Sequence, residues 1–138
     1  MAQTAREVMS NNVECIREDD TVLDAAKRLA ELNVGAMPIC GADERLKGML
    51  TDRDIVVKVL AAGKEPQHTR AGELAEGKPV TIGADDSLDE ALKTMAKYKV
   101  RRLPVIDGHK LVGILSQADV ARALPHDEVG RLLEIISE

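Results

Sequence analysis

The chain has 138 residues and 44% hydrophobic content, enough to bury a core of its own as one compact domain or two small lobes. Its 19 Lys and Arg against 24 Asp and Glu give a net charge of −5, and the basic residues are dispersed, which argues against nucleic acid or an anionic membrane as partner. No apolar run approaches the ~20 residues of a membrane span, and the N-terminus lacks signal-peptide features, so we expect a cytoplasmic protein.

Aromatic residues make up 1% of the chain: Tyr98 is the single tyrosine, and phenylalanine and tryptophan are absent. Proteins that bind single-stranded nucleic acid stack bases on several aromatic side chains, which this chain cannot supply. The core must be aliphatic, and a flat ligand would lie between aliphatic walls.

In chain order, the first expected element is a short strand around Val13 to Ile16, followed by a capped helix. Two strands, "AMPIC" and "LKGML", follow across the turn "GADER". A second helix is expected to begin at "TDRD", where Thr51 and Asp54 have the spacing of a capping box. Helical periodicity predicts that the two helices bury Val22, Ala25, Ala26 and Leu29, and Ile55, Val56, Val59 and Leu60.

The same order of elements then recurs, since Thr21 and Ser87 are 87 − 21 = 66 residues apart, and Thr51 and Ser116 are 116 − 51 = 65 apart. A strand at residues 80–82 leads to a helix, and "LPVI" and "KLVGIL" follow across the hairpin signal "DGH". A last repeat helix begins at "SQAD". The helices of this copy should bury Leu88, Ala91, Leu92 and Met95, and Val120, Ala121 and Leu124.

The repeat predicts an α/β fold of two β-α-β-β-α units packed about a pseudo-two-fold axis, because a three-stranded sheet with helices on one face needs a partner for the other. We place the first unit with its N-terminal lead-in at residues 1–66 and the second at 67–125. An amphipathic C-terminal helix follows at 126–138. Two related clefts between the units are the expected ligand sites.

Four capping-box patterns occur, at Thr21/Asp24, Thr51/Asp54, Ser87/Glu90 and Ser116/Asp119. The pairs that begin at Thr21 and Ser87 have nothing beside them that looks like a ligand contact, and we interpret them as caps. Thr51/Asp54 and Ser116/Asp119 each follow a glycine-containing strand that ends at the expected cleft. Contact with the hydroxyls of a nucleotide, capping alone, or both remain open for these two pairs.

The ending "hGhh[ST]xxDh" after "hxxxPh", present twice in register, resembles the tandem CBS-domain pair, or Bateman module. With "GMLTDRDIVVK", "VRRLPVI" and "MPICG" the chain looks closest to the small stand-alone bacterial CBS-pair proteins of the hypoxic-response type. The resemblance runs from about Ala5 to Leu124. It implies a non-catalytic regulatory or sensor module for adenosine nucleotides, usually a flat, disc-shaped dimer.

Carried onto this chain, the resemblance implies roles for specific residues. The hydroxyl–carboxylate pairs would hold the ribose: Thr51, Asp54, Ser116 and Asp119. Basic side chains would contact the phosphate: Arg53, Arg101 and Arg102. The apolar slots would be lined by Val34, Pro38, Val100 and Pro104. The ligand would be AMP, ADP, ATP or another adenosyl compound, and no cofactor is required.

The two copies differ at the expected phosphate contacts. Arg101 and Arg102 correspond to Gly35 and Ala36, and Arg53 corresponds to Ala118. Guanidinium groups suit phosphate, but the same arginines could equally be solvated or paired with the abundant carboxylates. If they bind phosphate, we expect one tight site and a weak or empty twin.

The two cysteines lie in the first copy, where a right-handed β-α-β crossover would place Cys15 beside Cys40. A disulfide there would stabilise the fold through loop entropy, although a permanent one is unusual in the cytoplasm. Two small core hydrophobes are the alternative. The three histidines lack metal-ligand spacing, and no catalytic set or phosphate loop occurs, so we expect neither a metal site nor an enzyme.

Our interpretation is a sensor that binds an adenosine nucleotide and acts on an unknown regulated protein. The rival is a ligand-free dimeric interaction scaffold, possibly redox-responsive through Cys15/Cys40. The terminal segment places four apolar side chains on one stripe, which suggests a homodimer interface formed by the long helices and this one: Val129, Leu132, Leu133 and Ile136.

Overall fold

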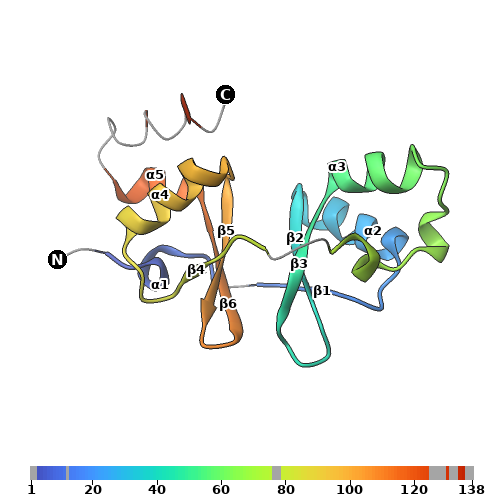
Figure 1. Cartoon of the computed structure of the whole chain (residues 1–138), viewed down its shortest axis with the longest axis horizontal. Coiled ribbons are helices and arrows are strands. Elements are labelled where there is room, and N and C mark those ends of the chain that lie inside the picture. The colour runs from blue at the N-terminus through green and yellow to red at the C-terminus, as the bar shows by residue number, and fades with distance from the viewer. Residues whose placement is uncertain (1–2, 12, 76–78, 125–129, 131–133, 136–138) are drawn as a thin grey trace. The chain divides into compact units, whose positions relative to one another are not determined.

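A computed structural model describes residues 3–11, 13–75, 79–124, 130 and 134–135 of the chain (Figure 1). The chain forms two compact units, each with its own hydrophobic core. The first-repeat unit is residues 14–79, and the second-repeat unit combines residues 1–13 with residues 80–138. Among the described helices, none combines the length and apolar character that crossing a membrane requires.

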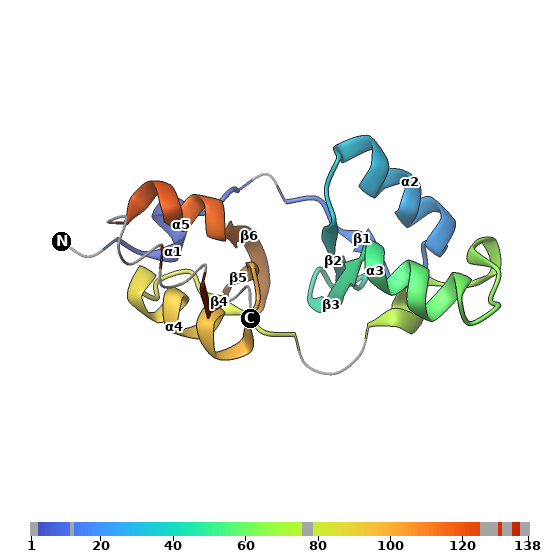
Figure 2. The same cartoon turned by 90° about the horizontal axis from the view of Figure 1, so that it is seen from above.

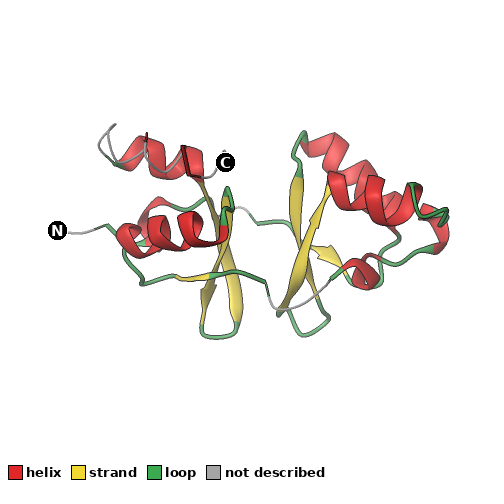
Figure 3. Cartoon of the chain, turned by 45° about the horizontal axis from the view of Figure 1, so that its top comes forward, coloured by secondary structure: helices red, strands yellow, loops and turns green. Residues whose placement is uncertain are grey.

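The first-repeat unit has a three-stranded sheet in the order β1-β2-β3, with β1 parallel and β3 antiparallel to the central strand. Its helices gather on one face of the sheet (Figure 3). In chain order the elements are β1 (Ile16–Arg17), α2 (Val22–Leu32), β2 (Ala36–Cys40), β3 (Leu46–Thr51), α3 (Asp52–Asp54), the π-helix η1 (Ile55–Leu60) and the 3-10 turns η2 (Pro66–His68) and η3 (Ala71–Leu74).

The second-repeat unit repeats this sheet in the order β4-β5-β6, with the same directions of pairing. Its described elements are α1 (Ala5–Val8), β4 (Ile82–Gly83), α4 (Leu88–Tyr98), β5 (Arg102–Asp107), β6 (Lys110–Ser116) and α5 (Gln117–Ala123). The β-α-β-β-α order of both repeats is therefore confirmed. The first strand of each repeat is shorter and begins later than predicted.

The N-terminal lead-in packs within the second-repeat unit, where α1 contacts α5 and β6 (Figure 2). The backbone of Ser10 exchanges two hydrogen bonds with that of Ile114, at 2.9 and 3.0 Å. Arg6 adds ion pairs to Asp107 at 3.0 Å and to Asp85 at 3.4 Å, which raise the pKa of its guanidinium. Each compact unit thus contains the lead-in of the other repeat, since residues 71–79 likewise belong to the first-repeat unit.

The long helices α2 and α4 begin and end alike. Thr21 and Ser87 accept a hydrogen bond from the third helical residue, and each helix ends on a left-handed residue, Asn33 (φ 54°) or Lys99 (φ 53°). Asparagine tolerates this conformation, whereas other residues with a Cβ lose about 1–2 kcal/mol in it. Predicted core positions of both helices are buried, with Ala26 and Leu92 partly exposed.

The helix after β3 differs from prediction. After one α-helical turn it continues as a π-helix, in which Ile55 and Val59 are buried but Val56 and Leu60 are 55% and 56% exposed. The prediction that Val56 and Leu60 are buried is therefore wrong. Two adjacent apolar stripes run along this helix, and the sheet of its own unit covers only one. In the other repeat Val120 is buried and Ala121 and Leu124 are partly buried.

The predicted terminal stripe lies outside the described residues, because Val129, Leu132, Leu133 and Ile136 all fall in the undescribed part of residues 126–138. The helical prediction for that segment, and its place in a dimer, therefore stay predictions.

The glycine of the last strand is required where the lead-in crosses it. A Cβ at Gly113 would lie 2.8 Å from the carbonyl oxygen of Ser10, whereas one at Gly35 would meet nothing closer than 3.6 Å. We expect Gly113→Ala to lower the free energy of unfolding by about 1–3 kcal/mol through overpacking. Gly35→Ala is the control and should change it by less than about 0.5 kcal/mol in denaturant titrations. Equal stability of the two variants would contradict the described packing.

Candidate functional site

The hydroxyl–carboxylate pair after β3 forms a reciprocal capping box. The backbone N–H of Thr51 donates to Oδ2 of Asp54 at 3.1 Å, and the N–H of Asp54 donates to Oγ1 of Thr51 at 3.0 Å. The second carboxylate oxygen, Oδ1, lies 3.5 Å from Nζ of Lys58. This carboxylate therefore caps with one oxygen and faces a cation with the other.

The pair after β6 has the same geometry. Ser116 N–H donates to Oδ2 of Asp119 at 2.9 Å, and Asp119 N–H donates to Oγ of Ser116 at 3.1 Å. Oδ1 of Asp119 accepts from Nη2 of Arg122 at 2.5 Å. The Asp119 side chain is 11% exposed, against 23% for Asp54, so the second carboxylate is the more enclosed of the two.

Capping is therefore confirmed for both pairs, and ligand contact would have to coexist with it. The box uses one carboxylate oxygen and the acceptor side of the hydroxyl, so a ligand could use the hydroxyl proton and could compete with Lys58 or Arg122 for the outer oxygen, Oδ1. At α2 and α4, by contrast, Thr21 and Ser87 cap without a described return bond from the carboxylate side chain. The return bond thus separates the two candidate pairs from Thr21 and Ser87, although a carboxylate also accepts from the backbone N–H of Thr4 at 3.2 Å and of Arg70 at 2.7 Å, at the starts of α1 and η3.

Arg101 and Arg102 lie beside Ser116 within the second-repeat unit. The Cα of Arg102 pairs with that of Ser116 across β5 and β6, and the carbonyl of Arg101 accepts from Gln117 N–H at 2.9 Å. Both side chains are exposed, and neither forms an ion pair within the described part of the chain. At the matching place in the first-repeat unit, Ala36 pairs with Thr51.

The remaining predicted contacts occupy mixed environments. Arg53 is exposed, and its backbone N–H donates to Asp52. Pro38 and Pro104 are buried, Val100 is partly buried, and Val34 is 36% exposed. Val34 lines a pocket of ≈ 470 Å³ within the first-repeat unit, together with Ala26, Leu29, Gly35, Asp52 and Val56.

Gln117 is a polar group that the sequence analysis missed. Its Oε1 is buried and has no hydrogen-bond partner among the described residues. A buried acceptor without a hydrogen-bond partner costs about 1–3 kcal/mol. In sequence Gln117 is one more polar residue of a capping box, so only the burial of Oε1 reveals it.

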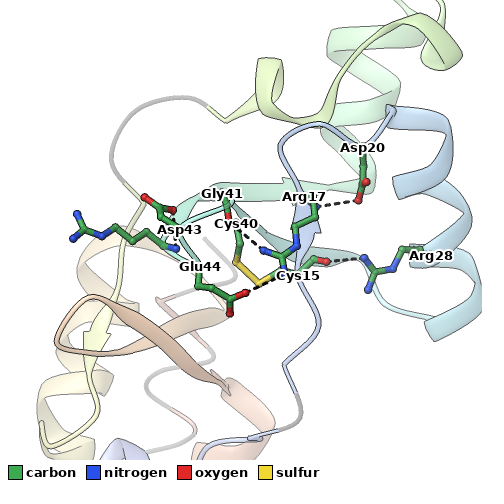
Figure 4. Close-up of polar contacts among 9 residues, drawn as sticks. Cys15, Arg17, Asp20, Arg28, Cys40, Gly41, Asp43 and Glu44 are labelled. Carbon is green, nitrogen blue, oxygen red and sulfur yellow. Dashed lines mark hydrogen bonds and ion pairs between the residues drawn. A yellow bond between two sulfur atoms is a disulfide. The ribbon is translucent and has the colours of Figure 1, made fainter.

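Cys15 and Cys40 form a disulfide, with Cα atoms 5.7 Å apart, which confirms that they lie side by side (Figure 4). Nη1 of Arg28 donates to the carbonyl of Cys15 at 2.6 Å, and Nη1 of Arg17 donates to that of Gly41 at 3.0 Å. The alternative of two free core thiols does not hold in this structure. The disulfide joins the residue before the two-residue strand β1 to the last residue of β2.

The turn next to this disulfide carries a perturbed carboxylate. The backbone N–H of Arg45 donates to Oδ1 of Asp43 at 3.1 Å and, with Lys47 at 3.2 Å, holds the pKa of Asp43 below its ordinary 3.8. Because the pKa of Asp43 is lower in the folded state, the ionised carboxylate stabilises the fold fully at pH values above the pKa of the unfolded state. This stabilisation is lost as the pH falls through the pKa of the folded state. Asp43 is exposed, so the contribution is small.

Both repeats match the family model of the CBS domain, over residues 5–61 and 71–126. Hypoxic response protein 1 of Mycobacterium tuberculosis is 47% identical over 133 residues, which are 96% of this chain and 93% of that protein. The chain therefore belongs to the CBS-domain family, as a tandem pair, and the resemblance found in the sequence is confirmed. CBS-domain proteins are generally regulatory modules.

Solved structures that share this fold include three that bear on the site. Hypoxic Response Protein I, with two coordinated zinc ions, has a TM-score of 0.83 and 50% identity over 89% of this chain and 100% of that chain. CBSX2 in complex with AMP has a TM-score of 0.75 and 26% identity over 87% and 94%. A hexameric CBS-CP12 protein from bloom-forming cyanobacteria has a TM-score of 0.77 and 32% identity over 93% and 75%. AMP binding and oligomers thus occur in the family.

The zinc ions belong to that related structure. In the described residues of the present chain, no three His, Cys, Asp or Glu side chains lie together as a metal site. Both cysteines are bonded to each other, and His68 Nδ1 lies 2.6 Å from a single carboxylate, Glu65. The expectation of no metal site stays a prediction.

Reduction of the disulfide should lower the free energy of unfolding by about 3 kcal/mol, because the cross-link restricts the unfolded chain. Denaturant titrations with and without dithiothreitol measure this difference, and mass spectrometry should show two hydrogens fewer in the untreated protein. A variant with Cys15→Ser and Cys40→Ser is the control, since reductant should not change its stability. Two freely alkylated thiols in untreated native protein would contradict the disulfide.

Proposed function

We propose that the chain is a non-enzymatic regulatory module that binds an adenosine-containing nucleotide and signals to a separate regulated protein. The observation that carries this proposal is the pair of reciprocal boxes, Thr51/Asp54 and Ser116/Asp119, each with a hydroxyl proton and with an outer carboxylate oxygen that only a cation of the same helix contacts. Ribose offers two neighbouring hydroxyls, which suit such a pair. AMP bound to the related CBSX2 supports the same ligand class.

In this proposal the ribose hydroxyls donate to Oδ1 of the aspartates and displace Lys58 or Arg122 from that oxygen. Arg101 and Arg102, next to Ser116, contact the phosphate, and the first-repeat unit offers Arg53. The unequal cations make the second-repeat unit the stronger site. The cleft between the units and its apolar slots stay predictions.

Asp119→Asn should weaken the binding of AMP about tenfold, because a neutral amide replaces a charge-assisted hydrogen-bond acceptor. Asp54→Asn should weaken binding at the Thr51/Asp54 pair, and its effect on total binding should be smaller because this pair is the weaker site. Isothermal titration calorimetry measures both. Asp24→Asn is the matched control, since Asp24 occupies the same helical position without the reciprocal box.

Binding that is unchanged in both variants would show that the two carboxylates only cap helices. Two equal sites per chain would refute the inequality of the units. Absence of heat with AMP, ADP, ATP and S-adenosylmethionine, in oxidised and reduced protein, would refute nucleotide binding. The variants' own loss of stability should stay near that of a weakened cap, about 1 kcal/mol.

We also propose that the protein forms a homodimer through the apolar face of the first-repeat unit, defined as Val34, Val56, Val57 and Leu60. These side chains are between 36% and 56% exposed, and Val34 and Val56 line one pocket. Contiguous exposed apolar side chains are typical of protein interfaces, and a two-fold axis would bury this face against its own copy.

Val56→Asp should convert the dimer to a monomer, because an unpaired charge would be buried in the interface. Multi-angle light scattering should give about twice the chain mass of 14.9 kDa for the parent protein and the chain mass for the variant. Thr81→Asp adds the same charge at an exposed site of the second-repeat unit and should stay dimeric. A parent mass near that of one chain at micromolar concentration would refute the homodimer.

A second candidate function is a redox-responsive interaction scaffold, and the Cys15–Cys40 disulfide favours it. The cross-link holds a strand of only two residues, so a dithiol reductant that converts the disulfide to two thiols loosens this edge of the sheet. A redox-dependent change of oligomeric mass without nucleotide binding would support the scaffold. Nucleotide binding that is the same in both redox states would favour the sensor.

A further inference from the structure

The Cys15–Cys40 disulfide joins two residues with unequal access to solvent. Cys15 is partly exposed and directly precedes the two-residue strand β1, whereas Cys40 is 1% exposed at the end of the central strand β2. The chain passes from one compact unit into the other between residues 13 and 14, just before Cys15. A small molecule in solution therefore meets Cys15 more readily than Cys40, at the point where the chain enters the first-repeat unit.

The other repeat builds the same corner without a cross-link. β4 pairs with β5 in the register in which β1 pairs with β2, so the residues that match Cys15 and Cys40 are Thr81 and Ile106. The fold of a repeat therefore does not need a covalent bond at this place. Loop entropy gives the disulfide a stabilising role, but two enclosed sulfurs would serve that role equally well.

The Cys40 end of the disulfide is covered. A Cβ on the next residue, Gly41, would lie 2.9 Å from a carboxylate oxygen of Asp43 and equally close to one of Glu18. Nη1 of Arg17 donates to the carbonyl of Gly41 at 3.0 Å (Figure 4), and Arg17 and Cys40 line one pocket of ≈ 340 Å³. Because Cys40 is almost fully buried, a molecule in this pocket meets little of it, whereas the pocket places a cation near the sulfur. A nearby cation favours the thiolate form of a cysteine.

The Cys15 end is held through its backbone. Nη1 of Arg28 donates to the carbonyl of Cys15 at 2.6 Å, and Nη2 of the same side chain lies 3.7 Å from Oε2 of Glu14. Neither contact involves the sulfur of Cys15, so both can persist when the S–S bond breaks. The backbone thus presents the Cys15 sulfur from a fixed position at the edge of the sheet.

We propose that Cys15 is an S-thiolation site, at which a low-molecular-weight thiol opens the disulfide. The thiolate of the incoming molecule attacks Sγ of Cys15, a new S–S bond forms to that sulfur, and the bond to Cys40 breaks. Cys40 leaves as a thiolate and takes up a proton in place of the one that the incoming thiol released. The exchange therefore needs no separate oxidant or reductant, and attack by Cys40 on the adduct reverses it.

The adduct removes the covalent tie where the chain enters the first-repeat unit. The segment is then held by the two paired residues of β1 and by the bond from Arg28 to the carbonyl of Cys15. Thiolation thus acts on the segment that connects the two units. This inference deepens the redox-responsive candidate function and is independent of nucleotide binding.

The test maps the sulfur that a thiol attacks in the native full chain, with glutathione as the probe. The reaction is stopped with an excess of N-ethylmaleimide in denaturant, which alkylates whichever cysteine has been released. Trypsin places Cys15 in residues 7–17 and Cys40 in residues 29–45, so mass spectrometry assigns each group separately. Glutathione on Cys15 with N-ethylmaleimide on Cys40 should exceed the reverse pattern at least about tenfold, because access decides which sulfur is attacked.

Protein unfolded in urea is the control, and its two patterns should agree within about threefold, since unfolding removes the difference in access. Equal patterns in the native protein, or glutathione mainly on Cys40, would overturn the proposal. So would a native protein that forms no adduct under conditions in which the unfolded protein does. A dithiol shares the first step of this chemistry, but dithiothreitol should give two alkylated cysteines, because its second thiol completes the reduction. A lasting adduct therefore identifies a monothiol.

Variants that carry the residue of the other repeat isolate each thiol: Cys40→Ile retains Cys15, and Cys15→Thr retains Cys40. With oxidised glutathione, the Cys15 thiol should form the mixed disulfide at least about tenfold faster than the Cys40 thiol. Equal rates in the folded variants would overturn the proposal. If either variant does not fold, as judged by circular dichroism, the adduct pattern of the native parent protein decides it. Attack at Cys15 with an unchanged oligomeric mass would support this site and refute the redox-responsive scaffold.

Discussion

In both repeats, the carboxylate three residues beyond the last strand bonds back to the N–H of the residue that ends this strand. This bond fixes where the strand stops and the helix starts, and it orients the carboxylate so that one oxygen belongs to the cap and the other faces a cation, Lys58 or Arg122. The neighbouring strand begins beside this point, because Ala36 pairs with Thr51 and Arg102 with Ser116. A helix cap and a potential ligand contact therefore share the same two side chains, and the cap keeps them oriented.

The two repeats also exchange their lead-ins: residues 1–13 belong to the second-repeat unit, and residues 71–79 belong to the first-repeat unit. Each lead-in passes close to the glycine of β3 or β6. A Cβ at Gly113 would lie 2.8 Å from the carbonyl oxygen of Ser10, and a Cβ at Gly48 would lie 2.9 Å from the Cβ of Ala75. The chain segment that enters the first-repeat unit is held by a two-residue strand and by the disulfide. Reduction of the disulfide would leave the segment held by the two-residue strand alone, so the anchoring of the segment depends on redox state.

Local patterns predicted most of the fold. The repeat offset, the helical spacing of apolar residues and the "DGH" turn are short-range signals, and they gave the order of elements and the caps. The cysteine contact was also predictable, because β-α-β crossovers have one hand. The first strand of each repeat was predicted too early in the sequence. A strand in which only two residues are paired is too short to show an alternation of apolar and polar side chains.

The features that the sequence did not reveal depend on tertiary structure. Val56 and Leu60 have the spacing of core residues, and only the tertiary structure shows that they are exposed. Lys99 looks like an ordinary helical lysine until the left-handed cap is seen. The unsatisfied oxygen of Gln117 and the exchange of lead-ins likewise depend on burial and on contacts between distant segments. These features set apart two repeats that the sequence pattern makes nearly equivalent.

The central claim is that the outer oxygens of the capping carboxylates hold ribose hydroxyls. The most direct measurement compares the affinities of AMP and of 2′,3′-dideoxy-AMP for the unmodified protein by calorimetry. The two ligands share base and phosphate and differ only in the hydroxyls that the carboxylates would accept from. The account predicts at least about tenfold weaker binding of the dideoxy compound, since charge-assisted hydrogen bonds are lost. Equal affinities would contradict it.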